Sequence, residues 1–385
     1  MSNYCPLPFL HLNLKQEGKV SACWRYPDRI GDYTNESLQE IWKGEKLNKL
    51  RNDLKAGNRP IGCRSCWDME DSGIKSTRQQ AIQDYKNYNI NNTIQSIEVR
   101  FDNICNLMCR HCSPDYSSKW EHAVKKNKNL NRLMIENGTY RKSDRHISLN
   151  QETIDQIIEL APNLKEILIA GGEPLYHEKH YQFIERLLPY ARNIKLSYNS
   201  NFTTLDYKGK NIINLWKHFK KVLVRVSIDG DDSCYEYVRT HNNLKQVENN
   251  IKIARELKNI KLSATCTTSM LNITKFPEII LYFNSLGVHF HASIVQYPLA
   301  LNPKLLPVEL KDQVTDRYLS VLSSLQRSQN YDRIKKYGDS VIDYMNSDDI
   351  DKFDMFLDYC TSLDQFHKTD LFSVYPEFKP FAPNI

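Results

Sequence analysis

The chain has 385 residues, of which 41% are hydrophobic and 25% charged, a balance typical of globular proteins large enough for more than one domain. With 52 basic and 46 acidic residues the net charge is only +6, and no basic stripe with interleaved aromatic residues occurs, so nucleic acid is not indicated as a partner. The first residues lack the pattern of a signal peptide and no apolar run is long enough to span a bilayer, so we expect a cytoplasmic protein without a membrane contact.

The first 80 or so residues are predicted to form a small unit of their own. "PFLHLNLKQEGKVSACW" alternates apolar residues on either side of Glu17-Gly18, which predicts a β-hairpin. "NESLQEIWKGEKLNKLRNDLKAG" predicts one amphipathic helix with Asn35 as its N-cap and Gly57 at its end. Its predicted apolar face consists of Leu38, Ile41, Trp42, Leu47 and Leu50.

Strand and helix patterns then alternate along roughly 200 residues. Six βα units in succession predict a parallel sheet that is closed into a barrel or into part of one. The last 85 residues look mainly helical. The six predicted strands are "IQSIEVRFDN", "KEILIAGGEP", "NIKLSYNSNFTT", "KVLVRVSIDG", "IKLSATCTTS" and "VHFHASIVQYP".

One face of these strands is repeatedly polar. In "KVLVRVSIDG" the apolar residues alternate with Arg225, Ser227 and Asp229. A parallel strand buried on both faces should be almost wholly apolar. We therefore expect the polar face to line a ligand-filled cavity, with the chemistry at the C-terminal ends of the strands.

Seven of the ten cysteines lie within the first 112 residues, and "CNLMCRHC" brings three of them together. In a reducing compartment such clusters favour metal ligation over disulfides. Cys105, Cys109 and Cys112 are one ligand short of a closed zinc site, and His111 is poorly placed between them to complete it. Three thiolates suit a [4Fe–4S] cube whose fourth iron stays open. Zinc and a chance cluster of core cysteines are the alternatives.

A second set of four thiols precedes this loop. Cys5 and Cys23 flank the predicted hairpin, and Cys63 and Cys66 form a C-x2-C pair. Four cysteines can close a site completely. Composition alone leaves zinc and an iron–sulfur cluster open here, because both accept four thiolates.

"CNLMCRHC" after the first barrel strand, with "AGGEP" after the second, resembles the radical S-adenosylmethionine (SAM) enzymes over roughly residues 94 to 300. The resemblance implies a partial (β/α)6 barrel and a [4Fe–4S] cluster on Cys105, Cys109 and Cys112. It also implies that SAM chelates the open iron and that its reductive cleavage gives a 5′-deoxyadenosyl radical, which abstracts a substrate hydrogen.

The same resemblance implies the contacts of SAM. The glycines of "GGEP" are expected to let the backbone approach it, and the glutamate to accept from its amino group. Arg239 is expected to pair with the carboxylate of SAM, and Val295 is expected to contact its adenine. The implied contact residues are Gly171, Gly172, Glu173, Asn201, Ser227, Asp229, Arg239 and Val295.

The N-terminal set of four cysteines resembles the auxiliary-cluster domains called SPASM, or the shorter twitch form. Most relatives carry this domain after the barrel, whereas here it precedes it. Cys5, Cys23, Cys63 and Cys66 would then hold one auxiliary [4Fe–4S] cluster that accepts or relays an electron. Two clusters are expected in all.

The sequence thus predicts an α/β enzyme, a radical SAM oxidoreductase or modifying enzyme. We expect an auxiliary domain at 1–80, the barrel at 94–300 and a helical extension at 301–385. The substrate would be a peptide or protein side chain or a sugar-type alcohol, and a flavodoxin or ferredoxin would supply electrons. Cys266, at the end of the fifth strand, is a weak candidate for a catalytic hydrogen-atom donor. The alternative is a non-catalytic zinc or iron–sulfur scaffold that retains the barrel.

Overall fold

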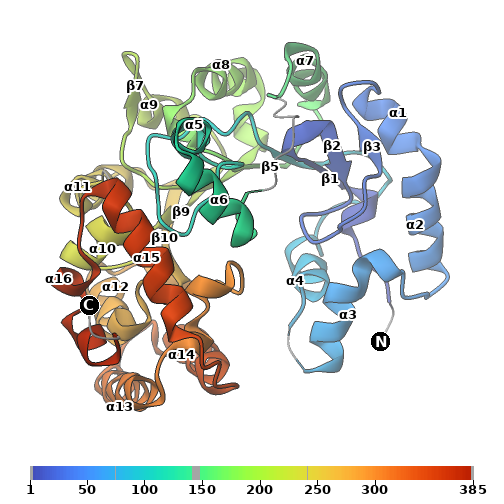
Figure 1. Ribbon diagram of the computed structural model, residues 1–385. Coiled ribbons are helices and arrows are strands. Elements are labelled where there is room, and N and C mark those ends of the chain that lie inside the picture. Colours follow the sequence, from blue (N-terminus) through green and yellow to red (C-terminus); the bar gives the residue numbers. More distant parts are fainter. Residues whose placement is uncertain (1–2, 74, 141–147, 241, 383–385) are drawn as a thin grey trace.

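A nine-stranded sheet forms the centre of the computed structural model, which describes residues 3–73, 75–140, 148–240 and 242–382 (Figure 1). Its order is β11-β10-β9-β6-β5-β4-β1-β2-β3. Strands β4 to β11 of this sheet run parallel to one another and lie in chain order, as a partial (β/α)6 barrel requires, so the predicted fold class is confirmed. These strands are β4 (Ser96–Val99), β5 (Glu166–Ile169), β6 (Lys195–Ser200), β9 (Lys221–Ser227), β10 (Ile260–Thr268) and β11 (His289–Ile294).

Helices cover the outer face of the parallel strands (Figure 1). Val222, Val224 and Val226 of β9 point to these helices and are buried, whereas Arg225 and Ser227 on the other face are only half-buried. Full burial of such an aliphatic side chain stabilises the fold by roughly 1.5–3 kcal/mol. The helices that follow the strands are α7 (Gln151–Leu160), α8 (Glu178–Leu187), α9 (Ile212–Trp216), α10 (Asp232–Val238), α11 (Leu244–Arg255) and α12 (Phe276–Ser285). A small separate hairpin consists of β7 (Asp206–Tyr207) and β8 (Lys210–Asn211).

The N-terminal hairpin extends the barrel sheet. β1 (His11–Leu14) pairs antiparallel with β2 (Lys19–Ser21), which pairs with β3 (Gly31–Asp32), so the predicted hairpin is confirmed. Its turn needs glycine at position 18, where φ is +74° and a Cβ would lie 2.4 Å from Asp32 Oδ1. β1 also pairs in parallel with β4. The first residues are therefore continuous with the barrel through backbone hydrogen bonds.

The single helix predicted over residues 35–57 is wrong in two respects. It is broken at Gly44 into α1 (Leu38–Lys43) and α2 (Glu45–Lys55). The N-cap is Ser37 rather than Asn35, because the Ser37 hydroxyl accepts from the Glu40 N–H while the Glu40 carboxylate accepts from the Ser37 N–H. All five side chains of the predicted apolar face are buried. Helices α3 (Arg64–Asp71) and α4 (Thr77–Asp84) follow.

The C-terminal region is helical, as predicted for the extension, whose residues 383–385 lie outside the described part of the chain. α14 packs on the edge strand β11. α15 crosses in front of the barrel beside α6 (Figure 1). No helix in the described ranges is long and apolar enough to cross a membrane. The remaining helices are α5 (Ser118–Lys126), α6 (Lys128–Glu136), α13 (Val308–Ser324), α14 (Tyr331–Asn346), α15 (Phe353–His367) and α16 (Leu371–Val374).

Candidate iron–sulfur and cofactor sites

The loop after β4 holds three thiols close together. The Cys112 N–H donates to the Cys109 carbonyl at 2.9 Å, and the Leu107 N–H lies 3.5 Å from Cys105 Sγ. Burial raises the pKa of all three thiols, that of Cys112 to about 12, and the neighbouring Cys109 raises the pKa values of Cys105 and Cys112 further. Without a cation, these thiols are neutral at pH 7. A metal group that binds them must therefore displace their protons.

The "GGEP" turn packs directly on this loop. Gly172 has φ +53°, and a Cβ there would lie 2.3 Å from the Ile104 carbonyl oxygen, immediately before Cys105. The Glu173 N–H donates to that same carbonyl at 2.7 Å. The absence of a side chain at position 172 thus has a reason within the protein: it lets two loops of the barrel rim meet.

Glu173 is almost fully buried in a network of protein donors. Its carboxylate accepts from the Leu175 N–H at 3.0 Å, the Ser200 hydroxyl at 2.7 Å and the Asn201 N–H at 2.6 Å. Burial raises the pKa of Glu173, and these hydrogen bonds offset part of the rise. A carboxylate has about four acceptor positions, so one remains for a further donor such as an ammonium group.

Asn201 connects this network to the cysteine loop. Its Nδ2 donates to Asn106 Oδ1 at 2.9 Å, and Asn106 in turn donates to the Thr203 hydroxyl at 2.8 Å. Asn106 is the residue after Cys105, and sequence reasoning did not single it out. The only signal available was its place inside "CNLMCRHC".

A buried ion pair lies on the other side of the loop. Arg239 Nη2 is 2.6 Å from Asp229 Oδ2, and Arg239 Nη1 donates to Cys109 Sγ at 3.7 Å. Although burial opposes its charge, the neighbouring Asp229 and Cys109 raise the pKa of Arg239. His111 Nε2 lies 3.5 Å from the same carboxylate, and burial lowers the pKa of His111.

Two buried nitrogen atoms around this ion pair have no partner among the described residues. They are the buried Nε of Arg239 and the buried Nδ1 of His111. Buried polar atoms are normally hydrogen-bonded. A polar ligand next to Cys109 would satisfy them, so these residues fit an anionic, hydrogen-bonding cofactor group at this position.

The other predicted contacts are distributed over the barrel rim. Ser227 is the last residue of β9 and is half-buried on the inward face, level with Thr265 of β10. Val295 follows β11 directly and donates its N–H to the Thr268 carbonyl at 2.9 Å. The structure does not bring Cys266 to this face. Cys266 shares the outward, helix-covered face of β10 with Ala264 and is fully buried, with the Asn272 amide 3.6 Å from its sulfur.

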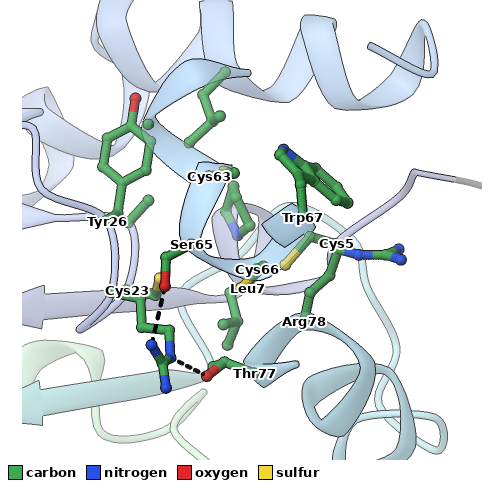
Figure 2. Close-up of a pocket in the computed structure, with 15 residues that line it drawn as sticks. Cys5, Leu7, Cys23, Tyr26, Cys63, Ser65, Cys66, Trp67, Thr77 and Arg78 are labelled. Carbon is green, nitrogen blue, oxygen red and sulfur yellow. Dashed lines mark hydrogen bonds between the residues drawn. The ribbon is translucent and has the colours of Figure 1, made fainter. Parts of the chain in front are cut away.

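The four N-terminal thiols line one pocket (Figure 2). Cys5 precedes the first 3-10 turn, Cys23 follows β2, Cys63 ends another 3-10 turn and Cys66 lies in α3. Counted with the solvent at its mouth, the pocket has a volume of about 460 Å³. Burial raises the pKa of Cys23 to about 11 and that of Cys63 to about 12.

Arginines fix the walls of this pocket. Arg25 donates to the Thr77 hydroxyl at 2.8 Å and to the Ser65 hydroxyl at 3.0 Å. Arg78 is paired with Glu70 and lies over the ring of Trp67 at 4.8 Å. Every cysteine in the described ranges is a free thiol.

At neither site do three or more His, Cys, Asp or Glu side chains of the described residues form a group that could hold a metal ion. A [4Fe–4S] cube binds each thiolate through a different iron, so its ligands do not meet at one atom. Four thiols around one enclosed pocket, and three on one loop next to unpartnered polar atoms, fit such a larger group.

Two protein-family models match this chain, and together they indicate which class of protein it is. Residues 99–283 match the model of the radical SAM superfamily, and residues 5–67 match the SPASM model, an iron–sulfur cluster-binding domain. These two matches identify the class of protein as an iron–sulfur enzyme that uses SAM. The chain belongs to the radical SAM superfamily, with its SPASM domain at the N-terminal end.

Family membership implies the cofactors. The radical SAM domain implies one [4Fe–4S] cluster and SAM, and the SPASM domain implies additional iron–sulfur. This favours iron–sulfur over zinc at the N-terminal pocket. Which cysteines hold which cluster, and which residues contact SAM, stay predictions.

Solved structures with a similar fold have low sequence identity to this chain. Native anSMEcpe with bound AdoMet is 17% identical with a TM-score of 0.42, and covers 61% of this chain and 63% of its own. Streptococcus suis SuiB bound to S-adenosylmethionine is 11% identical with a TM-score of 0.41, and covers 76% and 61%. This chain therefore spans less than two thirds of the length of either. No curated protein matches the chain.

Proposed function

We propose that this protein cleaves SAM reductively and uses the product to abstract a hydrogen atom from a substrate. When bound and reduced, the cluster supplies one electron to the sulfonium of SAM, whose carbon–sulfur bond breaks to give methionine and a 5′-deoxyadenosyl radical. The observation that carries the proposal is the packing of the three-thiol loop against Gly172 and Glu173. Next to the same loop, the buried Nε of Arg239 and the buried Nδ1 of His111 have no partner among the described residues, which a scaffold without a bound ligand would not explain.

The residues around the loop would bind and orient SAM. Cys105, Cys109 and Cys112 would hold the cube. The remaining acceptor position of Glu173 would take the amino group of SAM. The unpartnered Nε of Arg239 would donate to its carboxylate, while Asp229 keeps the guanidinium charged and fixed in orientation.

The other rim residues would contact the nucleoside part of SAM. Asn201 and Ser227 would meet the ribose, and Val295 the adenine. Asn201 is held by Asn106 at 2.9 Å, so its position depends on the cysteine loop. This coupling supports the view that the cluster and the nucleoside occupy neighbouring places.

The auxiliary cluster, on Cys5, Cys23, Cys63 and Cys66, would handle electron transfer with the substrate radical. Four thiolates leave no iron open, so this cluster would not bind the substrate directly. β1, which carries the hairpin before Cys23, pairs with β4. This pairing keeps the auxiliary pocket attached to the barrel. A closed cluster that accepts an electron from the substrate radical would suit oxidation of a peptide or protein side chain or of a sugar-type alcohol.

The inward face of the sheet favours a substrate with an anionic group. Arg225 is half-buried there, and no hydrogen bond or ion pair of its guanidinium occurs within the described ranges. The nearby carboxylate of Glu98 forms an ion pair with Arg100, whose Nη2 lies 2.6 Å from Glu98 Oε1. Burial and the neighbouring cations Arg333 and Arg225 lower the pKa of His291 to about 4, so His291 adds no second positive charge to this face. An unpaired, half-buried cation would be stabilised by a carboxylate or phosphate.

Anaerobic reconstitution tests the proposal. About eight irons per chain with matching sulfide are expected for two cubes, and about four for one. Dithionite and SAM should then give 5′-deoxyadenosine. Zinc without sulfide, or an iron-replete sample that forms no 5′-deoxyadenosine, would support the non-catalytic scaffold instead. Acidic and basic peptide libraries of matched length would test the substrate charge, with faster 5′-deoxyadenosine formation expected for the acidic set.

A further inference from the structure

A groove lies on the outer side of the cysteine loop, between α5 and the end of α15. Met108, Lys119, His122, Ala123, Lys126 and Phe366 line it. Counted with the solvent at its mouth, its volume is about 740 Å³. None of these residues is among those predicted to contact SAM, so the groove is a surface distinct from the cofactor site.

The floor of the groove touches the loop that would carry the cluster. Met108 precedes Cys109 in the chain and is nearly buried. On the buried side of α5, the Trp120 indole N–H donates to the Cys109 carbonyl at 3.0 Å. The Trp120 ring stacks on Phe366 with centroids 5.9 Å apart. Two short routes, through Met108 and through Phe366 and Trp120, therefore connect the groove with Cys109.

The rim of the groove is basic. Lys119, His122 and Lys126 are spaced three and four residues apart, which places them on one face of α5. All three are exposed, and neither lysine takes part in an ion pair among the described residues. The one acidic residue of α5, Glu121, is occupied by Lys125 at 2.5 Å and by the Asn103 amide at 2.7 Å. A partner of negative surface charge is thus complementary to this rim.

The chemistry of the site requires such a partner. Each SAM cleavage consumes one electron, and the thiols that would hold the cluster are buried or half-buried. Electron transfer falls steeply with distance, so a donor protein must approach the loop closely. The groove offers an apolar floor for contact, a short route to Cys109 and a basic rim for steering.

We propose that this groove docks an acidic one-electron carrier protein of the flavodoxin or ferredoxin class. The carrier loses one electron, the cluster on Cys105, Cys109 and Cys112 gains it, and no atom is transferred. This inference rests on the proposed function. Met108 and Phe366 are the contact residues at the floor, and Lys119 and Lys126 orient the acidic face of the carrier.

A charge-reversal experiment tests the docking. In the reconstituted full-length protein, Lys119→Glu/Lys126→Glu is compared with wild type and with Lys46→Glu/Lys49→Glu. The control pair is exposed on α2, which lies at the right edge of Figure 1, away from α5, and its reversal changes the net charge equally. Association of a reduced acidic flavodoxin and the loss of the cluster's visible absorbance are followed by stopped flow at low and high salt, and affinity by calorimetry.

We expect roughly tenfold slower association and reduction at low salt for the α5 variant, with little change for the α2 variant. Dithionite is small and needs no docking, so it should reduce all three proteins equally. Unchanged flavodoxin kinetics in the α5 variant, or an equal loss in both variants, would overturn the docking site. Tighter binding of a DNA duplex than of flavodoxin at this rim would overturn it in favour of nucleic acid. If dithionite fails to reduce the wild-type cluster, the proposed function fails instead.

Discussion

The two cysteine sites are built in opposite ways. Cys105, Cys109 and Cys112 share one short loop, but the groups that hold this loop come from far along the chain: Glu173, Arg239 and Asp364. The four auxiliary thiols come from separate segments, while their supports, such as Arg25 and Arg78, lie within the same N-terminal region. The three-thiol site would bind and release SAM at its open iron, so the surrounding protein has to hold the loop in place. The four-thiol site is closed, and its own cysteine ligands would hold the cluster.

The largest effect is expected from removing the ligands of the loop. Cys105→Ala/Cys109→Ala/Cys112→Ala should lose about four of about eight irons and all formation of 5′-deoxyadenosine, because one cube would have no thiolate left. Iron and sulfide analysis and chromatography of the SAM products measure this. Loss of all iron, or none, would contradict the assignment of two independent clusters.

Removing ligands of the auxiliary cluster should distinguish the roles of the two clusters. Cys23→Ala/Cys66→Ala should lose the other half of the iron, while dithionite-driven SAM cleavage stays within about twofold of wild type, since the auxiliary cube is not needed to break the carbon–sulfur bond. The remaining cluster should keep an electron paramagnetic resonance signal that changes when SAM is added. If SAM cleavage disappears although this signal remains, the electron route to SAM must pass through the auxiliary site.

This contrast also explains what the sequence could predict. The three-thiol loop and the six strands are local patterns, so spacing and alternation were enough to find them. Pairing of β1 with β4 joins residues more than 80 positions apart, and no local pattern encodes it. The break at Gly44 was missed because the apolar face continues across it, and Ser37 rather than Asn35 caps the helix because only Ser37 has Glu40 three residues on.

Some residues of the candidate site could be predicted from local motifs, whereas their partners could not. Glu173 and Arg239 were identified from family motifs, but their partners depend on tertiary structure. No local pattern predicts that Arg239 pairs with Asp229 while it also contacts Cys109. Cys266 was a candidate from its place at a strand end, yet its register turns it to the outer face. One residue of register decides between the two faces of a strand.

Gly172→Ala tests how closely the two rim loops must approach. Its Cβ would lie 2.3 Å from the Ile104 carbonyl and φ is +53°, so overpacking and backbone strain together should cost about 2–6 kcal/mol of unfolding free energy. Gly209→Ala is the matched control: φ is +79° but nothing lies within 4 Å, so only the strain of about 1–3 kcal/mol should appear. Denaturant titration of the unloaded protein measures both. Equal losses would mean that the loops can separate without cost.

Asp364→Asn should give the smallest of these effects, and it tests whether the C-terminal extension supports the loop. Arg110, between Cys109 and Cys112, is fully buried and donates to Asp364 Oδ1 at 2.8 Å, and Tyr237 also bonds this carboxylate at 3.2 Å. Replacing the charged acceptor beside a buried guanidinium should cost about 1.5–3 kcal/mol.

The exposed pair Arg186–Asp155, joined at 2.6 Å, provides the control. Asp155→Asn should lower the free energy of unfolding much less than Asp364→Asn does, because solvent screens that pair. Because Asp364 holds the loop through Arg110, its variant should also lose iron from the SAM-binding cube faster under a chelator, with the auxiliary iron unaffected. Equal chelation rates in wild type and variant would show that the extension stabilises the fold without holding the loop.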